Sequence, residues 1–392
     1  MGCWIVKLQG GPKYSNQAAV AIDDKIYSFG SCHCFRDDSN EQNVETFGVH
    51  VLNTIDYRWK FVPTTPFVSN PSEQLIDGSG MVYKPYGEIP SLRVGHTVVA
   101  YQGKVYLWGG CCPATRFIYP KIYCFDPVQR TWSVIPSANE PPIPRIKHTA
   151  VVYNDTMFIY GGIENDSATN GIILCNNICA YHFETRKWRY IIIYGGISVE
   201  RFQHTACVID GKMYVYGGID AEQWTLCLDI IDLQQGYCQR PVTKGRRPRG
   251  IRAACSWVYN SKMYIFGGYR FRSEHYITTL HRFDPKTMVW QRIKPFGLRG
   301  PSGRERHCGV VVGDCAYVFG GEFFERINMP SADFPGHWVE MCDLSVLSYN
   351  WTLKNLAAIA VLQYQLNLTN SDQLPFDLKI HLDLMTRRNG EL

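Results

Sequence analysis

The chain has 392 residues, of which 45% are hydrophobic and 19% are charged, a composition typical of globular proteins. It contains no run of about 18 apolar residues, so the sequence predicts no membrane-spanning helix. The net charge of +5 is small for this length and does not by itself indicate nucleic-acid binding.

The chain contains fifteen cysteines. Its first residues lack the basic and apolar regions of a secretory signal peptide. We therefore interpret them as free thiols in a reducing compartment, which predicts a cytoplasmic protein and leaves the nucleus open as a second location. Their spacing does not match a zinc site, so we predict no metal and no cofactor.

A short phrase recurs along the chain, in which an apolar strand ends in two glycines. A degenerate copy, YSFGSC, contains Gly30, and the first full copy is LWGGCC at 107–112. The first glycines of the full copies are Gly109, Gly161, Gly217, Gly267 and Gly320. These copies are 50 to 56 residues apart, a period typical of β-propeller blades. One more doublet, Gly195–Gly196, is out of phase, and we interpret it as part of a loop.

Three other features keep the same register. Thirteen residues before the first glycine stands His96, His148, His204 or His307, and three residues earlier stands Arg93, Arg145, Arg201 or Arg304. After the doublet, a second apolar strand leads to an Asp-turn-Trp phrase, such as FDPVQRTW ending at Trp132. The fourth full copy, which belongs to the fifth repeat when the degenerate copy is counted, departs from the pattern, because Ala254 stands where a histidine is expected.

This combination resembles the kelch repeat and implies an all-β fold, a six-bladed kelch β-propeller with a short C-terminal helical segment. We expect residues 1–351 to form the propeller, with an N-terminal strand at Trp4 completing the last blade. Residues 352–392 form the expected helical segment.

The glycine doublet also has a direct physical interpretation. Glycine allows a positive φ and a close approach between backbones, so a side chain there is expected to collide with the adjoining blade. The repeated tryptophan is expected to fill the wedge between blades. A phosphate-binding loop is disfavoured, because no helix follows the doublet.

The segment after each doublet and the segment before each histidine are expected at one rim of the propeller, because adjacent strands run antiparallel. This rim is basic and aromatic, and a guanidinium suits a carboxylate. Simple solvated charge is the competing interpretation. We interpret the repeated arginines and histidines as structural. The predicted ligand-binding residues are Lys147, Phe202, Arg252, Arg270, Arg272 and Arg306.

A basic run, KGRRPRG at 244–250, lies in the loop that enters the fifth predicted blade, before the copy at Gly267. We interpret it as a solvated loop, with a nuclear-import or nucleic-acid patch as the alternative. The corresponding alternative function is a nuclear or chromatin-associated kelch scaffold without a ligase role.

The tail changes pattern from Leu353 onward. Apolar or small residues recur at helical spacing, which predicts one apolar helix face that would pack under the propeller: Leu353, Leu356, Ala357, Ala360, Val361 and Tyr364. A second helix is expected after a polar interruption, with Pro375 in its first turn.

Two motifs in this tail carry a closer resemblance. Leu353, Ala357 and Val361 resemble a BC box, which implies Elongin C binding. Leu374, Pro375 and Leu378 resemble a Cullin-2 box. After a kelch propeller, this pair is similar to the kelch-repeat substrate receptors of Cullin-2 RING ubiquitin ligases.

That resemblance implies a non-catalytic adaptor with Elongin B/C and Cullin-2 as partners. It also implies that the ligands are C-terminal degrons of client proteins, often ending in glycine. Relatives hold the terminal carboxylate with arginines just after the blade-four doublet, but here GGIDAEQW at 217–224 has none. Arg252, Arg270 and Arg272 are expected to substitute. A copper enzyme is disfavoured, because no compact Tyr/His set occurs.

Overall fold

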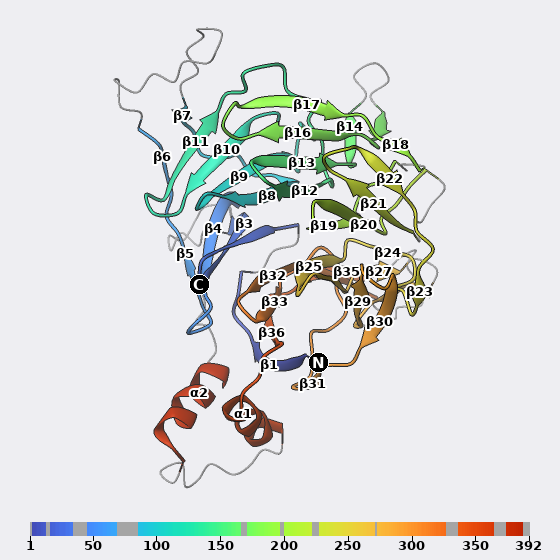
Figure 1. Ribbon diagram of the computed structural model, residues 1–392. Coiled ribbons are helices and arrows are strands. Elements are labelled where there is room, and N and C mark those ends of the chain that lie inside the picture. Colours follow the sequence, from blue (N-terminus) through green and yellow to red (C-terminus); the bar gives the residue numbers. More distant parts are fainter. Residues whose placement is uncertain are drawn as a thin grey trace.

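The computed structural model is a six-bladed β-propeller with two helices outside the ring of blades (Figure 1). It describes residues 2–12, 16–33, 45–68, 85–165, 171–196, 200–221, 227–270, 273–326, 336–363 and 374–386. The innermost strands of neighbouring blades contact one another all the way round the ring, and the sixth contacts the first. The predicted all-β propeller is therefore confirmed.

Each blade contains four main antiparallel strands. In the first three blades, from the axis outward, these are β2 (Ala18–Ile22), β3 (Lys25–His33), β4 (Glu45–Asn53) and β5 (Arg58–Phe61); β8 (Val94–Tyr101), β9 (Lys104–Cys111), β10 (Ile122–Asp126) and β11 (Thr131–Ile135); and β12 (Thr149–Tyr153), β13 (Thr156–Tyr160), β16 (Ile178–His182) and β17 (Lys187–Ile191). In the last three blades they are β19 (Thr205–Ile209), β20 (Lys212–Tyr216), β21 (Leu228–Asp232) and β22 (Tyr237–Gln239); β25 (Cys255–Tyr259), β26 (Lys262–Phe266), β29 (Leu280–Asp284) and β30 (Val289–Ile293); and β32 (Cys308–Val312), β33 (Cys315–Phe319), β36 (Leu344–Ser348) and β1 (Cys3–Leu8).

Tight turns join the two inner strands of a blade. In the second blade the turn residues Gln102 and Gly103 have φ of 46° and 72°, and in the fourth blade Asp210 and Gly211 have φ of 49° and 72°. Two successive positive φ values define the hairpin turn whose twist matches that of the flanking strands. These short polar-glycine pairs therefore set the strand register locally.

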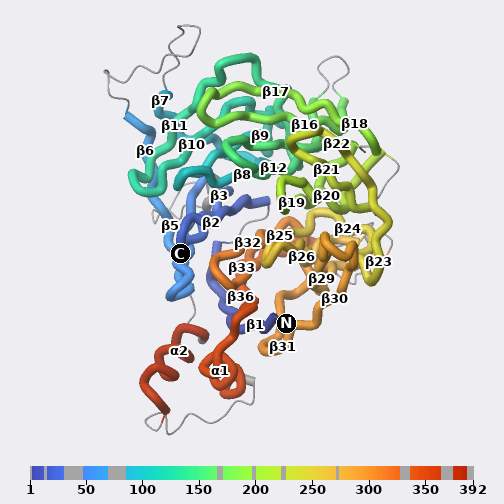
Figure 2. Tube along the Cα trace, viewed as in Figure 1, coloured from blue at the N-terminus to red at the C-terminus, as the bar shows by residue number. Residues whose placement is uncertain are grey.

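The two ends of the propeller sequence meet in the sixth blade. The N-terminal strand β1 pairs antiparallel with β36, with Lys7 opposite Ser345. Figure 2 shows the blue N-terminal segment beside the orange-red strand β36. This pairing closes the ring and covers the edge of β36 that would otherwise be unpaired.

Short segments that link consecutive blades cover most of the outer blade edges. Four parallel pairs form in this way: β6 (Thr65–Pro66) with β11, β18 (Tyr194–Gly195) with β22, β23 (Lys244–Gly245) with β30, and β31 (Phe296–Gly297) with β1. The interpretation of Gly195 as an incidental loop glycine is therefore wrong. Its φ is +97°, and a Cβ there would lie 2.7 Å from the Cys238 carbonyl oxygen, so glycine permits this edge strand.

The glycine doublets bring neighbouring blades into close contact, as the sequence predicts. A Cβ on Gly109 would lie 2.5 Å from the Arg145 carbonyl oxygen and 2.7 Å from the His148 ring, both in the next blade. A Cβ on Gly110 would lie 2.8 Å from the Cβ of His96 in the same blade. With φ of 70° and 84°, both positions also favour glycine conformationally.

The repeated tryptophans fill the wedges between blades, which confirms that prediction. Each packs on the aromatic residue that precedes the doublet of the neighbouring blade. The ring-centroid distances are 4.9 Å for Trp59–Phe319, 5.7 Å for Trp132–Phe29, 5.4 Å for Trp188–Trp108, 4.9 Å for Trp290–Tyr216 and 6.2 Å for Trp4–Phe266. In the fourth blade the fully buried Cys238 takes the position of the tryptophan.

The repeated arginines are structural, as interpreted from the sequence. All four are at most 1% exposed, and each guanidinium donates to the carbonyl of the first glycine of its own blade, at 3.1 to 3.4 Å. Three of them also pair with a buried carboxylate: Arg145 with Glu164, Arg201 with Asp229, and Arg304 with Asp343. Because a buried charge needs such partners, these arginines bind within the blade and not to a ligand.

The repeated histidines are also buried and connect one blade to the next. The Nε2 atoms of His148 and His204 lie 2.8 Å from the hydroxyl oxygens of Thr97 and Thr149 in the preceding blade. In the fifth blade, where Ala254 replaces the histidine, the hydroxyl of Thr205 instead donates to the Ser256 hydroxyl. The missing histidine is thus replaced by a local polar contact between the same two blades.

The C-terminal segment contains α1 (Leu353–Gln363) and α2 (Phe376–Thr386), which lie outside the ring beside the sixth blade (Figure 1). The buried residues Ala358 and Ile359 of α1, with Leu382 and Met385 of α2, join the hydrophobic core around β1 and β36. The helices were predicted from spacing, but the predicted apolar face was only partly right, because Val361 packs against the core whereas Leu353 and Ala357 are exposed. Tyr364 lies outside the described residues. Leu353 is 83% exposed, because the propeller surface selects the neighbouring face of α1.

Acidification below pH 6.5 is expected to destabilise the propeller through its buried histidines. Burial, helped by the charge of Arg93, lowers the pKa of His96 from 6.5 to about 3, and burial near Arg304 lowers the pKa of His307 to about 3. Between those values the unfolded chain binds more protons than the folded chain. The free energy of unfolding is therefore highest above pH 6.5 and falls as the pH drops, by up to about 1.4 kcal/mol per pH unit for each histidine.

Urea denaturation at pH 7 and pH 5 measures this effect. The His307→Gln variant should show a flatter pH dependence, and Gln17 already occupies the equivalent position in the first blade. His275→Gln removes an exposed histidine and is the matched control. Equal slopes for His307→Gln and the unmodified chain would contradict the assignment.

Candidate functional site

The segments before the repeated histidines and after the doublets meet at one rim, as the sequence predicts. Isolated bridges join Ile146 to Ile163, Phe202 to Ile219 and Glu305 to Glu322. In the fifth blade, β24 (Ile251–Arg252) pairs with β27 (Tyr269–Arg270), which pairs with β28 (His275–Tyr276). Two further hairpins extend this rim: β14 (Ile163–Asn165) with β15 (Ile172–Leu174), and β34 (Glu322–Arg326) with β35 (Gly336–Glu340).

Arg252 lies on this rim but is partly neutralised. Its Nε donates to a carboxylate oxygen of the fully buried Glu305 at 3.1 Å, and its guanidinium lies 4.9 Å from the centre of the Tyr269 ring. About a quarter of its side chain is exposed. Arg252 can therefore present only part of its guanidinium to a ligand.

Arg306 has a similar arrangement in the sixth blade. One guanidinium nitrogen binds the carboxylate of Glu322, and the group lies 5.4 Å from the Trp338 ring centre. Its buried Nε has no hydrogen-bond partner among the described residues. Trp338, which is 46% exposed, is a rim residue that the sequence analysis missed, because its partner is supplied by another segment.

Lys147 differs from both arginines, because no carboxylate lies within ion-pair distance of its ammonium among the described residues. It lies 5.6 Å from the ring centre of Phe202. Burial, followed by the positive charge of Arg306, lowers the pKa of Lys147. A negatively charged ligand beside Lys147 would favour the charged ammonium and so raise its pKa again.

The remaining predicted rim residues divide into two. Arg270 is half-buried in β27, opposite Ile251, while Arg272 lies outside the described residues. The structure thus brings Lys147, Arg252 and Arg306 together, and the charge of each of the other two contributes to lowering the pKa of Lys147.

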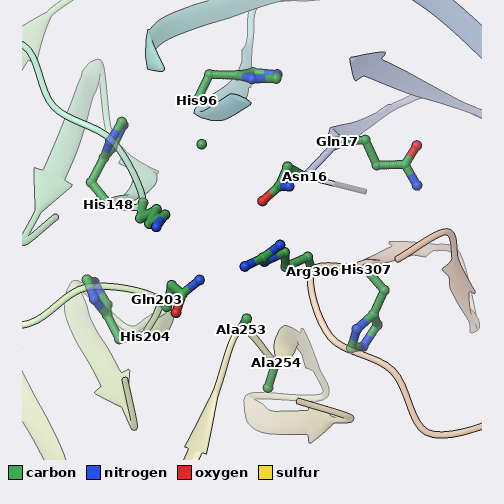
Figure 3. Close-up of a pocket in the computed structure, with 12 residues that line it drawn as sticks. Asn16, Gln17, His96, His148, Gln203, His204, Ala253, Ala254, Arg306 and His307 are labelled. Atoms are coloured by element: carbon green, nitrogen blue, oxygen red, sulfur yellow. The ribbon is translucent and has the colours of Figure 1, made fainter. Parts of the chain in front are cut away.

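A cavity of about 140 Å³ opens at the centre of the propeller (Figure 3). Lys147 and Arg306 line it, together with Asn16 and Gln203. Neither amide is among the ligand-binding residues predicted from the sequence. Each immediately precedes a repeated histidine or its equivalent, Gln17, so the register of the repeat identifies both positions.

The residues of the two tail motifs differ in exposure. Leu353, Ala357 and Pro375 are exposed, whereas Val361, Leu374 and Leu378 are half-buried against the core around β1. The side chains that are free to contact a partner are therefore at the start of α1 and the start of α2. Phe376, which is 75% exposed, adds to this surface.

The basic run at 244–250 lies at the outer edge of the fifth blade. The amides of Lys244 and Arg246 donate to carbonyls of the segment 288–290, and the Pro248 carbonyl accepts from Tyr216. Lys244, Arg246, Arg247 and Arg249 are exposed. The run thus begins as a fixed cationic edge of the fifth blade and ends at Gly250, directly before the rim strand β24.

No group of three or more His, Cys, Asp and Glu residues in the described part of the chain is arranged to hold a metal ion. The described helices are also too short to cross a membrane.

Comparisons with known proteins agree with this architecture. The model of the KLHDC2/KLHL20/DRC7 Kelch-repeats domain matches residues 95–321. Kelch domain-containing protein 3 of Homo sapiens and that of Bos taurus are each 30% identical over 397 residues, covering 99% of this chain and 97% of theirs.

More distant similarities are shorter or limited to the fold. The leucine-zipper-like transcriptional regulator 1 homolog of Drosophila melanogaster is 32% identical over 246 residues, covering 58% of this chain and 24% of that protein. Among solved structures, that of YjhT matches with a TM-score of 0.56 and 12% identity, covering 84% of this chain and 95% of its own. The near full-length match and the kelch-domain match establish that this chain belongs to the kelch-repeat family that includes kelch domain-containing protein 3.

Proposed function

We propose that this protein is a non-catalytic substrate-recognition adaptor of a Cullin-2 RING ubiquitin ligase. The propeller rim binds the C-terminal tails of client proteins, and the C-terminal helices bind Elongin B/C and Cullin-2. Holding a client near the ligase raises the effective concentration of its lysines at the site of ubiquitin transfer. This role requires two binding surfaces on one rigid body and no catalytic residue.

The observation that carries the proposal is the state of α1. Its buried residues Ala358 and Ile359 fix the helix to the propeller, while Leu353 in its first turn is 83% exposed. Thr352 caps this turn, because its hydroxyl accepts from the Asn355 amide at 3.2 Å. Leu353 therefore stays available to a partner on a helix whose position is fixed, and it is one of the residues of the BC-box motif.

The start of α2 carries further exposed apolar side chains. Phe376 is 75% exposed and Ile380 is 44% exposed, and α2 packs beside α1. These residues follow Leu374 and Pro375, the start of the proposed cullin-binding motif. Elongin C is assigned to Leu353, Ala357 and Val361, and Cullin-2 to the segment that begins at Leu374.

The rim supports recognition of a carboxylate. Lys147, Arg252 and Arg306 bring three positive charges near one another, and Glu305 and Glu322 compensate only two of them. One positive charge therefore remains for a ligand. Aromatic side chains beside it, Phe202, Tyr269 and Trp338, can pack against the residues that precede a terminal carboxylate.

Replacement of Leu353 by arginine should weaken Elongin B/C binding by roughly 30-fold or more without unfolding the protein. The side chain is almost fully exposed, so its contribution to folding is small, whereas a buried interface anchor contributes about 2 kcal/mol or more, a roughly 30-fold loss of affinity. Co-purification and titration with Elongin B/C measure this loss. Val128→Arg, at an 88% exposed turn of the second blade, is the matched control, and Elongin binding that survives Leu353→Arg would refute the docking surface.

Client-like peptides with a free C-terminus should bind more tightly than the same peptides with an amidated C-terminus. Loss of one charge-assisted contact weakens binding by about 10- to 100-fold. Fluorescence polarisation with a peptide library that includes glycine-ended sequences measures the ratio. Equal affinities for the acid and the amide would remove carboxylate recognition from the proposal and leave the helical docking surface standing.

A further inference from the structure

Six residues, one from each blade, form a ring around the propeller axis, which we call the axial ring. All six have positive φ, between 49° and 73°: Asn16, Gly95, Lys147, Gln203, Ala253 and Arg306. Five are not glycine, and positive φ is uncommon for such residues. Because positive φ is unfavourable for these residues, the surrounding structure must hold them in this conformation.

Backbone hydrogen bonds connect the axial ring from blade to blade. The amide of Lys147 donates to Gly95 at 2.8 Å, Gln203 to Lys147 at 3.0 Å, Ala253 to Gln203 at 2.8 Å, and Arg306 to Ala253 at 2.9 Å, each time to the carbonyl oxygen. The positive φ values and these bonds together fix the Cα–Cβ directions of Lys147, Gln203, Ala253 and Arg306. The ring is therefore preorganised.

The side chains of the axial ring form three opposed pairs, because the first and fourth, second and fifth, and third and sixth blades face each other across a six-bladed ring. Asn16 faces Gln203, and Lys147 faces Arg306. Gly95 faces Ala253, and because neither residue has a long side chain, this pair leaves space in the middle of the ring. In Figure 3, Asn16, Gln203 and Arg306 point toward the middle of the ring, while His96 and His307 turn away from it.

The space inside the ring is large enough for a polyatomic ion. The cavity holds about 140 Å³, whereas one water needs only about 10–15 Å³ by the same kind of measure. Lys147 has no carboxylate partner among the described residues, and the buried Nε of Arg306 has no hydrogen-bond partner there. Two opposed cationic side chains that still have N–H groups to donate, together with two opposed amides, suit an anion and not a metal cation.

We propose that the axial ring is a binding site for one small oxyanion, carrying carboxylate or phosphate chemistry. Lys147 and Arg306 bind its oxygens from opposite sides, and the amide nitrogens of Asn16 and Gln203 donate from the other two. The site shares Lys147 and Arg306 with the carboxylate-binding rim proposed above, so its peptide arm rests on that proposal, whereas its phosphate arm requires only the propeller. Its occupant is either a free oxyanion such as phosphate or the carboxylate of a peptide that enters from the rim.

Calorimetric titration of the full chain with inorganic phosphate, in a phosphate-free buffer with chloride held at constant ionic strength, tests the site. A free-acid peptide, alone and in competition with phosphate, forms the second arm. Saturable one-site binding of either probe is expected. Lys147→Met should weaken it by about 10- to 100-fold and Gln203→Met by about 2- to 10-fold. Lys147→Arg should retain it.

Lys187→Met is the matched control, because it removes one positive charge from an exposed position of β17 and should leave binding unchanged. Urea denaturation of each variant in the phosphate-free buffer verifies that it is folded. Phosphate that binds and displaces the peptide supports one shared site, and peptide binding alone that requires Lys147 supports the carboxylate source. No saturable binding of either probe, or equal loss in Lys147→Met and Lys187→Met, would overturn the proposal.

Discussion

The contact on which this architecture depends is the buried hydrogen bond from a repeat arginine to the carbonyl of the first doublet glycine. It occurs in four blades, with the guanidinium at most 1% exposed. The guanidinium joins the segment before the inner strand to the end of the second strand. The residue directly before the repeated histidine has a positive φ, and this residue lies on the axis. In these four blades the contact holds the segment that supplies the rim and the axial ring, while Asn16 and Ala253 also take a positive φ in the two blades without the arginine.

This arrangement separates residues that maintain the fold from residues that can vary. The arginine, the histidine and the glycines face backbone and neighbouring blades, where a change of side chain would leave a buried polar group unpaired or cause a collision. The residue between the arginine and the histidine that lies on the axis has no such constraint beyond its positive φ. Its identity differs in every blade, from Gly95 to Arg306. Binding specificity can therefore change here with little cost to the propeller.

The sequence predicted the features that depend on local pattern. The doublets, the wedge tryptophans and the common rim follow from register within one repeat, and the structure confirms them. Three features depend on partners distant in sequence, and these the sequence did not reveal. Glu305 and Glu322 neutralise part of Arg252 and Arg306, Gly195 forms an edge strand against Cys238, and α1 buries Ala358 in place of Ala357. Helical spacing identifies an amphipathic helix, but the docking partner decides which neighbouring face is buried.

The sixth blade links the two proposed binding surfaces. It supplies Arg306 and Glu322 to the rim, and its outer strand β1 supports α2 through the shared hydrophobic core. A close-packed core is rigid. A ligand on the rim and a partner on the helices would therefore be held at a fixed separation and orientation. An adaptor benefits from such rigidity, since effective concentration falls when the two bound macromolecules can move independently. The pairing of the first strand with the last blade thus does more than close the ring, because it ties the helical appendage to the blade that contributes the rim's Arg306.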